Sequence, residues 1–285
     1  MSERLADVGR RIATVHQLGA VVNAMRGIAG ARAQQSRALL PAIRAYAETA
    51  ARAIGQAMQL DIIRAGAGNV GGGRPGLIVF GAEQGFAGAF AEQVLDTAGS
   101  EFATRHVFLV GDRAAALAAE RDLQVSWQVS LPGRAAALAD LATKIVEALY
   151  DYLAEAGPVP IALIYPVWMP GRGTSVIRRS LLPLDPASFD QPGSGPAPLT
   201  NLPPAELVER LAQEYVFAQL CEAAAEAFAA ENEARMTTMA AAKTNIDGKL
   251  QALQLEERLT RQDEITAEVV ELAAGARARK SRDRF

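Results

Sequence analysis

The stretch RLADVGRRIATVHQLGAVVNAMRGI, residues 4–28, decides the fold of this chain. Apolar residues recur in it at alternating steps of three and four, namely Leu5, Val8, Ile12, Val15, Leu18, Val22, Met25 and Ile28. This spacing places them on one helix face and is typical of a coiled coil. We expect the helix to begin near Ser2 and to reach about Leu40. Pro41 lacks a backbone N–H and should kink or interrupt the helix, which resumes over 42–60.

A second long helix is expected at the other end, because residues 207–272 contain no proline and one glycine, Gly248. The two ends carry opposite charge: eight basic and three acidic residues over 1–60, against six basic and fourteen acidic over 206–271. Opposite charge favours pairing of the two helices. Charge alone leaves the pairing parallel or antiparallel, and two unrelated solvated faces are the alternative. Most carboxylates of the last helix are interpreted as a solvated face.

The middle of the chain has a different texture. A glycine-rich linker over 66–76 is followed by alternating strands and helices, which indicates a mainly parallel sheet covered by helices. The predicted strands are 77–80, 106–110, 125–129, 159–165 and 174–182, and the predicted helices are 88–98, 113–121 and 138–154. Seven prolines over 183–204 predict an irregular loop. The predicted domains are therefore 1–65 (N-terminal coiled-coil helix), 66–183 (inserted α/β domain), 184–204 (Pro-rich loop) and 205–285 (C-terminal coiled-coil helix and basic tail).

Composition excludes several classes of protein. The net charge of -3 argues against a general nucleic-acid binder. The single cysteine, Cys221, excludes an internal disulfide framework and fits a small buried residue in a reducing compartment. No apolar run reaches the length that spans a bilayer, and the N-terminus does not read as a secretory signal.

Two glycine motifs are candidate ligand sites. Gly66, Gly68 and Gly71 match the dinucleotide fingerprint, but they follow a predicted helix and precede a strand, which is the wrong context. The turn 81–88 lies between a strand and a helix, where a helix N-terminus can hold an anion. It lacks the Gly-Lys-Ser/Thr ending of a P-loop, so a tight strand-to-helix turn is the preferred interpretation.

No catalytic or metal site emerges from the sequence. The only histidines, His16 and His106, lie far apart, and Cys221 has no neighbouring cysteine or histidine. We therefore expect no cofactor and no catalytic residue in this chain.

Collinear motifs resemble the gamma subunit of F-type ATP synthases. The N-terminal resemblance lies in Arg11-Ile12, the run 24–29, Arg32 and the run 46–49; in the middle, GFAGAF at 85–90 resembles the family's Gly-Leu-Cys-Gly-x-Phe turn. The C-terminal matches are Glu214-Tyr215-Val216, Glu231, Ala234-Arg235-Met236, Met239-Ala240-Ala241, Asn245, Arg261-Gln262, Ile265-Thr266 and Glu268. The order and spacing of the family hold over nearly the whole chain.

The resemblance implies an α/β fold in which long terminal helices form an antiparallel coiled coil, with an inserted Rossmann-like domain of mainly parallel sheet. It implies a non-catalytic central rotor stalk that couples ion-driven rotation of a membrane ring to the catalytic beta subunits. The implied partners are the alpha/beta hexamer, the epsilon subunit and the membrane c-ring, at the cytoplasmic face of the bacterial inner membrane without direct insertion.

The family pattern also assigns contacts. Arg261, Gln262, Thr266 and, further along the helix, Glu268 would contact the hexamer, the first three at its catch loops. Met25 and Arg32 would lie near the beta levers, and Glu231 with Arg235 matches a pair tied to coupling. The small stretch 27–33 is expected to permit close packing and to lie where the shaft meets the hexamer bore.

The sequence departs from the family near its end. Arg258 stands where the family often has asparagine, Asp263 and Glu264 replace small residues, and the tail after Gly275 is basic rather than apolar. These changes indicate a divergent branch, with the alternative ATPases encoded beside an ordinary ATP synthase as one candidate. Two rival functions stay open from the residues alone: a nucleotide-binding α/β enzyme using the turn 81–88, and a free-standing coiled-coil adaptor.

Overall fold

The computed structural model describes residues 3–58, 72–189 and 199–282. Its α-helices are α1 (Glu3–Met58), α2 (Phe90–Ala98), α3 (Glu101–Thr104), α4 (Asp112–Glu120), α5 (Leu138–Ala156) and α6 (Pro204–Arg282). Its strands are β1 (Gly76–Phe80), β2 (His106–Val110), β3 (Trp127–Val129), β4 (Ile161–Met169) and β5 (Gly173–Leu182), with short 3-10 helices at Ala135–Ala137 and Pro186–Ser188. Residues 59–71 and 190–198 lie outside the described residues, so the predicted linker over 66–71 and the central part of the Pro-rich loop are not described.

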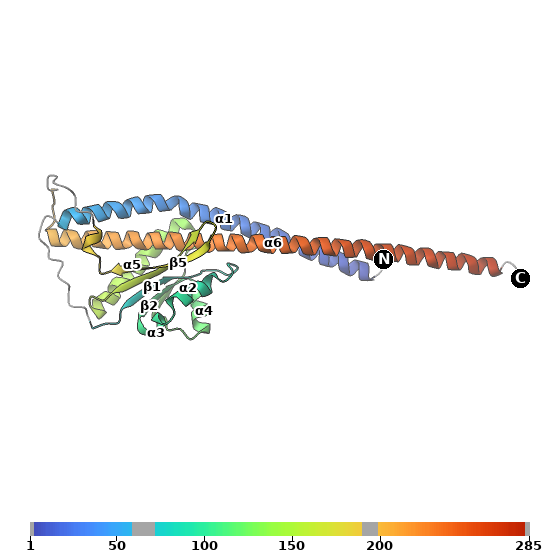
Figure 1. Ribbon diagram of the computed structural model, residues 1–285, viewed down its shortest axis with the longest axis horizontal. Helices are drawn as coiled ribbons and strands as arrows, with labels where there is room; N and C mark the ends of the chain where they lie inside the picture. Colours follow the sequence, from blue (N-terminus) through green and yellow to red (C-terminus); the bar gives the residue numbers. More distant parts are fainter. Residues whose placement is uncertain (1–2, 59–71, 190–198, 283–285) are drawn as a thin grey trace. The chain divides into compact units, whose positions relative to one another are not determined.

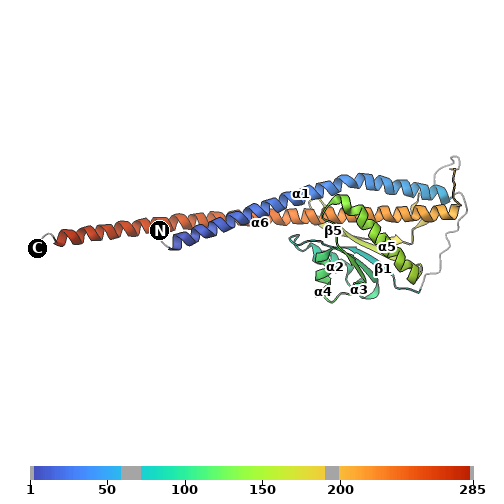
Figure 2. The same cartoon turned by 180° about the vertical axis from the view of Figure 1, so that it is seen from behind.

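The chain divides into two compact units, each built from parts of both long helices. One unit combines residues 1–27 with 238–285, and the other comprises residues 28–237. This division cuts across the domain boundaries expected from the sequence, which stay a prediction. Each unit is described separately below, and Figures 1 and 2 show the helices and strands from opposite sides.

In the first unit, the start of α1 and the end of α6 pair as antiparallel helices. A Cβ built on Gly19 would lie 3.2 Å from Ile246. Arg11 forms an ion pair of 3.8 Å with Glu256. As the position on α1 falls, its partner on α6 rises, so the helices run in opposite directions. This is the antiparallel coiled coil that the sequence predicted.

The apolar stripe on α1 is only partly buried. Leu5, Val8 and Val22 are buried as predicted, whereas Leu18 and Ile28 are 52% and 55% exposed. Small residues make the closest approach instead, because close helix packing needs little side-chain volume at the crossing. The stripe therefore lies only in part against the partner helix.

Pro41 does not interrupt α1, which is continuous through it. The proline is exposed. Water can therefore satisfy the carbonyl whose helical hydrogen bond the ring removes, and solvent on that side leaves room for the ring. The predicted interruption was wrong for this physical reason.

The second unit contains a five-stranded sheet in the order β3-β2-β1-β4-β5. The first four strands are parallel, and the edge strand β5 pairs antiparallel with β4. All five residues of β1 are buried, as expected for a strand covered on both faces. The mainly parallel inserted sheet predicted from the sequence is confirmed; half of the strand bounds are as predicted, four differ by one or two residues, and β4 ends four residues later than predicted. The short helix α3 was not predicted.

Alternate residues of each strand face two separate cores. Ile78, Phe108 and Leu163 pack with α5 and with the alanine-rich part of α6. Leu77, Leu109 and Ile164 pack on the other face with α2 and α4. This two-sided cover is the arrangement of a doubly wound α/β domain. The long helix α6 is thus part of the core of the inserted domain as well as half of the helix pair.

Candidate functional site

The turn that follows β1, residues 81–88, lies against α6. Gly81 begins it so close to α4 that an added Cβ would lie 2.3 Å from the side chain of Ala114. Phe86 has a φ of 63°, in the left-handed region where non-glycine residues are uncommon. The Phe86 side chain is 68% exposed. The turn is therefore closely packed at its start and presents an aromatic ring to solvent further on.

Glu231 of α6 accepts hydrogen bonds from the backbone of this turn. Its two carboxylate oxygens accept from the backbone N–H groups of Glu83, at 2.9 Å, and Gln84, at 3.0 Å. Arg235, one helical turn later, pairs with the same carboxylate. Both side chains are nearly fully buried, Glu231 at 2% and Arg235 at 5% exposed. The pairing satisfies two charges that would be costly to bury alone.

Arg235 completes the connection by donating to the turn itself. Its Nε donates to the carbonyl of Gly85 at 3.2 Å, and a terminal nitrogen donates to the carbonyl of Gln84 at 3.3 Å. Its other terminal nitrogen donates to Asn232 Oδ1 at 3.1 Å. The turn thus exchanges both donors and acceptors with α6, which fixes its position on the helix.

Glu83 plays a similar part on the sheet side of the turn. Its carboxylate accepts from the backbone N–H of Asp112, the first residue of α4, at 3.1 Å and of Leu131 at 2.7 Å. Burial raises the pKa of Glu83, and the nearby carboxylates of Asp112 and Glu231 raise it further, against those two hydrogen bonds. The Glu83 carboxylate therefore links the turn after β1 to the start of α4 and to the loop after β3.

These carboxylates occupy three backbone N–H groups at this edge of the sheet. Backbone N–H groups at a strand-to-helix turn or a helix N-terminus bind anions. Here the N–H groups of Glu83, Gln84 and Asp112 already donate to carboxylates of the chain itself. The arrangement disfavours a nucleotide at the turn 81–88 and supports its interpretation as a structural turn.

In the second unit, ion pairs also join α1 to α6. Arg37 pairs with Glu233 at 2.7 Å, and Arg44 pairs with Glu222 at 2.9 Å and with Glu226 at 2.6 Å. The hydroxyl of Ser36, which is fully buried, donates to the carbonyl of Ala225 at 2.7 Å. The attraction expected from the opposite charges is confirmed. The interpretation of the α6 carboxylates as a solvated face was wrong for these residues, because they pair with α1 or with the turn.

The residues predicted to touch the hexamer lie in different places. Arg261, Gln262, Thr266 and Glu268 are exposed on α6 in the first unit. Arg261 bonds to Glu257 at 3.1 Å, and the Thr266 hydroxyl donates to the carbonyl of Gln262 at 2.8 Å, both within the helix. Met25 and Arg32 are half-buried on α1, in the first and second units respectively. Among the predicted site residues, the structure brings Glu231 into contact with Arg235. The predicted residues between 261 and 268 lie close together on neighbouring turns of α6.

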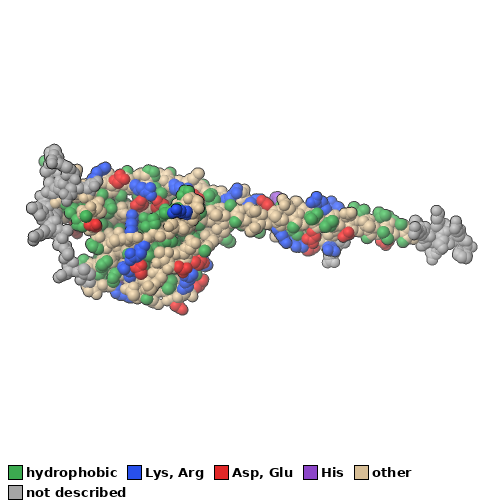
Figure 3. All heavy atoms as spheres, in the orientation of Figure 1, with side chains coloured by type: hydrophobic (Ala, Val, Ile, Leu, Met, Phe, Trp, Pro, Cys, Tyr) green, Lys and Arg blue, Asp and Glu red, His purple; other side chains and the backbone are tan. Residues whose placement is uncertain are grey.

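The end of α6 carries exposed apolar side chains. The register of the first unit places Glu3, where α1 begins, opposite about residue 263, so α6 continues beyond the start of α1. The large apolar side chains exposed from here on are Ile265, Val269, Val270 and Leu272, following Leu255 and Leu259. Hydrophobic side chains are visible along this segment in Figure 3. Such a contiguous row on a helix is typical of an interaction surface.

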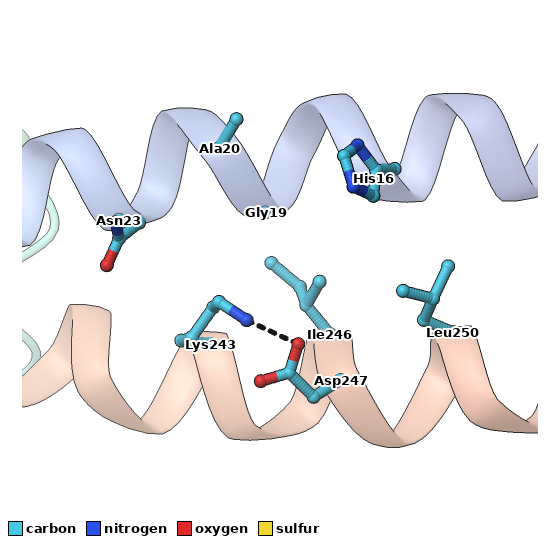
Figure 4. Close-up of a pocket in the computed structure, with 8 residues that line it drawn as sticks. All are labelled: His16, Gly19, Ala20, Asn23, Lys243, Ile246, Asp247 and Leu250. Atoms are coloured by element: carbon cyan, nitrogen blue, oxygen red, sulfur yellow. Dashed lines mark hydrogen bonds and ion pairs between the residues drawn. The ribbon is translucent and has the colours of Figure 1, made fainter.

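A cleft of about 360 Å³ opens between the two helices of the first unit (Figure 4). Its lining combines small and apolar residues with His16, Asn23 and an ion pair between Lys243 and Asp247. Because Asp247 neutralises Lys243, the cleft offers no uncompensated lysine charge. We assign no ligand to it.

The described residues lack two further features. They contain no group of three or more His, Cys, Asp or Glu side chains arranged to hold a metal ion. Within the same ranges, no helix is long and apolar enough to cross a membrane.

The sequence did not predict the long-range partners of Glu231, Arg235 and the other charged residues of α6. Gln84 and Gly85 act through backbone groups, which no side-chain pattern reveals, and Arg37 and Arg44 pair with specific α6 carboxylates in a register that charge totals cannot supply. The glycine turn itself was the available signal. The sequence favoured a tight strand-to-helix turn there, but it gave no sign that this turn attaches the inserted domain to α6.

Several known proteins are similar to this chain in sequence. A family model described as ATP synthase matches residues 4–278. The ATP synthase gamma chain of Parafrankia sp. (strain EAN1pec) is 27% identical, with 98% of each chain covered. That of Frankia casuarinae is 26% identical with the same coverage. The gamma chain of Polynucleobacter asymbioticus is 35% identical over 36% of each chain.

Solved structures share the fold at low identity. A chain of the Euglena gracilis mitochondrial ATP synthase (OSCP/F1/c-ring, rotational state 3) matches with a TM-score of 0.67 at 14% identity, covering 99% of this chain and 96% of that one. A chain of the Tetrahymena thermophila mitochondrial ATP synthase central stalk and c-ring matches with a TM-score of 0.54 at 16% identity, covering 78% and 99%.

Proposed function

This chain belongs to the ATP synthase family, among its gamma chains, and we propose that it works as the central rotor stalk of an F-type ATP synthase or ATPase. In that role it couples ion-driven rotation of the membrane ring to conformational change at the catalytic beta subunits. The observation that carries the proposal is the paired terminal helices with a sheet domain inserted between them, over a chain that the family model matches almost end to end.

The structure supplies the asymmetry that a rotor needs. A shaft can drive sites through different affinities only if it contacts each state of those sites differently. The two helices of this shaft differ in sequence, charge and length, and only one continues past the other in the first unit. Each orientation of such a shaft offers a different surface to the subunits around it.

We propose that the chain is a non-catalytic subunit and binds no nucleotide itself. The support is that the carboxylate of Glu231 occupies the backbone N–H groups of Glu83 and Gln84 in the turn 81–88. The proposed partners are the alpha/beta hexamer, the epsilon subunit and the membrane c-ring. The proposed location is the cytoplasmic face of the bacterial inner membrane, where the complex holds the chain without direct insertion.

The site residues of the resemblance become specific proposals. Arg261, Gln262 and Thr266 contact the catch loops of the hexamer, and Glu268 contacts the hexamer further along; their exposure on α6 supports this. The exposed apolar side chains from Leu255 onward give the same helix an apolar surface that faces the surrounding hexamer.

The other four residues divide into two pairs. Met25 and Arg32 lie near the beta levers, since each side chain is only partly buried. Glu231 and Arg235 act in coupling by holding the turn 81–88 to α6.

Only part of the small stretch 27–33 is buried. Ala29 and Ala33 are buried, and a Cβ on Gly30 would lie 3.3 Å from Met236 Sδ. Leucine at Ala29 or Gly30 would therefore disturb helix packing whatever surrounds the shaft. A test of the proposed bore contact should use Gly27 and Ala31, which are exposed. Leucine at both positions should lower ATP-driven rotation while leaving the isolated chain folded.

Co-purification tests the function. A tagged full-length chain should bring down an ATP-hydrolysing hexamer at one copy per three beta-like chains. Recovery of the chain without such a hexamer would favour the free-standing adaptor. Tight binding of ATP or ADP by the purified chain would favour the nucleotide enzyme, and a Glu231→Gln variant should then change that affinity.

A further inference from the structure

Glu222 of α6 is a meeting point of three elements in the second unit. One carboxylate oxygen accepts from Arg44 of α1 at 2.9 Å. The other lies 3.6 Å from a terminal nitrogen of Arg179, on the edge strand β5. The Glu222 side chain is only 16% exposed, so these partners replace much of its hydration. One carboxylate thus joins α6 both to the other shaft helix and to the inserted sheet.

The guanidinium of Arg179 is held from three directions. Besides Glu222, a terminal nitrogen donates to the backbone carbonyl of Gln219 at 3.3 Å, and the guanidinium carbon lies 5.1 Å from the ring centre of Tyr165 on β4. The latter distance is within the range of a cation–π contact. A planar guanidinium held in this way keeps one orientation, whereas a lysine ammonium on a flexible stem can rotate.

The core between α6 and this face of the sheet is apolar. The buried residues that α6 gives to it include four alanines and the larger Val216, Leu220 and Phe228. Burial of apolar surface holds two elements together but is non-directional. The polar contacts at this interface are the ones that depend on direction.

Two polar contacts between α6 and the inserted domain are spaced along the helix. Glu231 fastens the turn after β1, and Glu222 fastens β5. Nine residues separate them, which is roughly 14 Å of helix. A single polar attachment would give the sheet one point about which to pivot, whereas two separated attachments oppose that pivoting.

We propose that Glu222, with Arg179, is a positioning pair that stops the inserted domain from pivoting on α6 when the stalk carries torque. This rests on the proposed function as a rotor stalk. Torque entering through the inserted domain would pass to the helix pair through this contact. In this arrangement Arg44 fixes the Glu222 side chain from the α1 side and is secondary to the sheet contact.

The test combines a measurement on the isolated full-length chain with one on the assembled complex. In the isolated chain, a double-mutant cycle of Glu222→Gln and Arg179→Gln should show an unfolding equilibrium constant that departs from additivity by about fivefold. In the complex, either variant should keep its ATP hydrolysis rate within about twofold while ATP-driven ion pumping per ATP falls about threefold or more. A purely structural role would change stability without changing this ratio.

Two further variants separate the explanations. Glu206→Gln makes the same charge change on α6 at an exposed pair with Arg210 and should leave the pumping ratio unchanged. Arg44→Gln retains the sheet contact and should also keep most of the coupling. If Glu222→Gln fails to assemble, Arg179→Gln carries the test.

Normal assembly with unchanged pumping in both Glu222→Gln and Arg179→Gln would overturn the proposal and leave the stalk function intact. If the wild-type chain did not assemble with a hexamer, the stalk function would fail first. A positive cycle in the isolated chain would then mark the pair as a structural contact only.

Discussion

Replacement of Glu231 should destabilise the inserted domain more than any change at an exposed carboxylate of α6. Glu231→Ala removes the partner of the buried Arg235 guanidinium and the acceptor of two backbone N–H groups. Breaking a buried ion pair by deleting one partner costs about 3–5 kcal/mol, because the other charge stays buried. Each unsatisfied N–H would add to this cost unless water enters. We expect a loss of about 4 kcal/mol, a large share of typical domain stability.

Two further variants separate the effect of the lost charge from the effect of the lost side-chain volume. Glu231→Gln keeps the side-chain volume and one carbonyl acceptor but loses the charge, so it should cost about 2 kcal/mol. Replacing both Glu231 and Arg235 by Met removes both buried charges at similar volume. The double variant should therefore be more stable than Glu231→Ala, because an apolar pair can substitute for a buried ion pair.

Guanidinium unfolding of the isolated chain measures these differences. The two tryptophans, Trp127 and Trp168, lie on strands of the sheet, so their fluorescence reports the unit that contains Glu231. Glu268→Ala, at an exposed position of the same helix, is the matched control and should change stability by less than about 0.5 kcal/mol. If the free energy of unfolding of Glu231→Ala lay within about 1 kcal/mol of wild type, the role given to Glu231 in holding the turn 81–88 to α6 would be refuted.

Three further predictions use other features of the structure. Burial raises the pKa of Cys221 to about 11, so the native thiol should react with a disulfide reagent at pH 8 about 100-fold more slowly than in guanidinium; equal rates would contradict the buried position. The hydrogen bond from Tyr46 to Glu214 raises the pKa of Tyr46 from 10 to about 12, so the stability that it contributes is complete below pH 10 and is lost as the pH rises towards 12. The stability difference between wild type and Tyr46→Phe should shrink across that window, and a difference that stays constant to pH 12 would exclude the bond. Gly81→Ala should cost about 2 kcal/mol or more in thermal or guanidinium unfolding, because the new methyl group would overlap α4, whereas Gly85→Ala meets no atom within 4 Å and should cost under about 1 kcal/mol; equal costs would refute the packing of the turn.

The regular elements were largely predictable because their signals are local. The β1 and β2 strands are short apolar runs buried on both faces, and their bounds were predicted to within one residue. The long helices were predictable from periodicity and from the absence of proline over 207–272. Pro41 misled, because its effect depends on exposure, which the local sequence does not contain.

The attachment of the inserted domain to the helices could not be predicted in the same way. Glu231 was singled out only through the family resemblance, and its true partners are backbone N–H groups of residues about 150 positions earlier. Glu222 was counted among the charged residues of α6, yet its partners Arg44 and Arg179 come from two other elements. Long-range pairing depends on the register of packed elements, and total charge gives only its sign.

Direct observation of rotation tests the central claim. A complex fixed through its hexamer would carry a probe on a single cysteine introduced at Glu120, an exposed residue of α4, in a chain whose only native cysteine is replaced by Cys221→Ala. The account predicts that ATP turns the probe in one direction, in steps of a third of a turn set by three catalytic subunits. A probe that stays still while the same complexes hydrolyse ATP would contradict it.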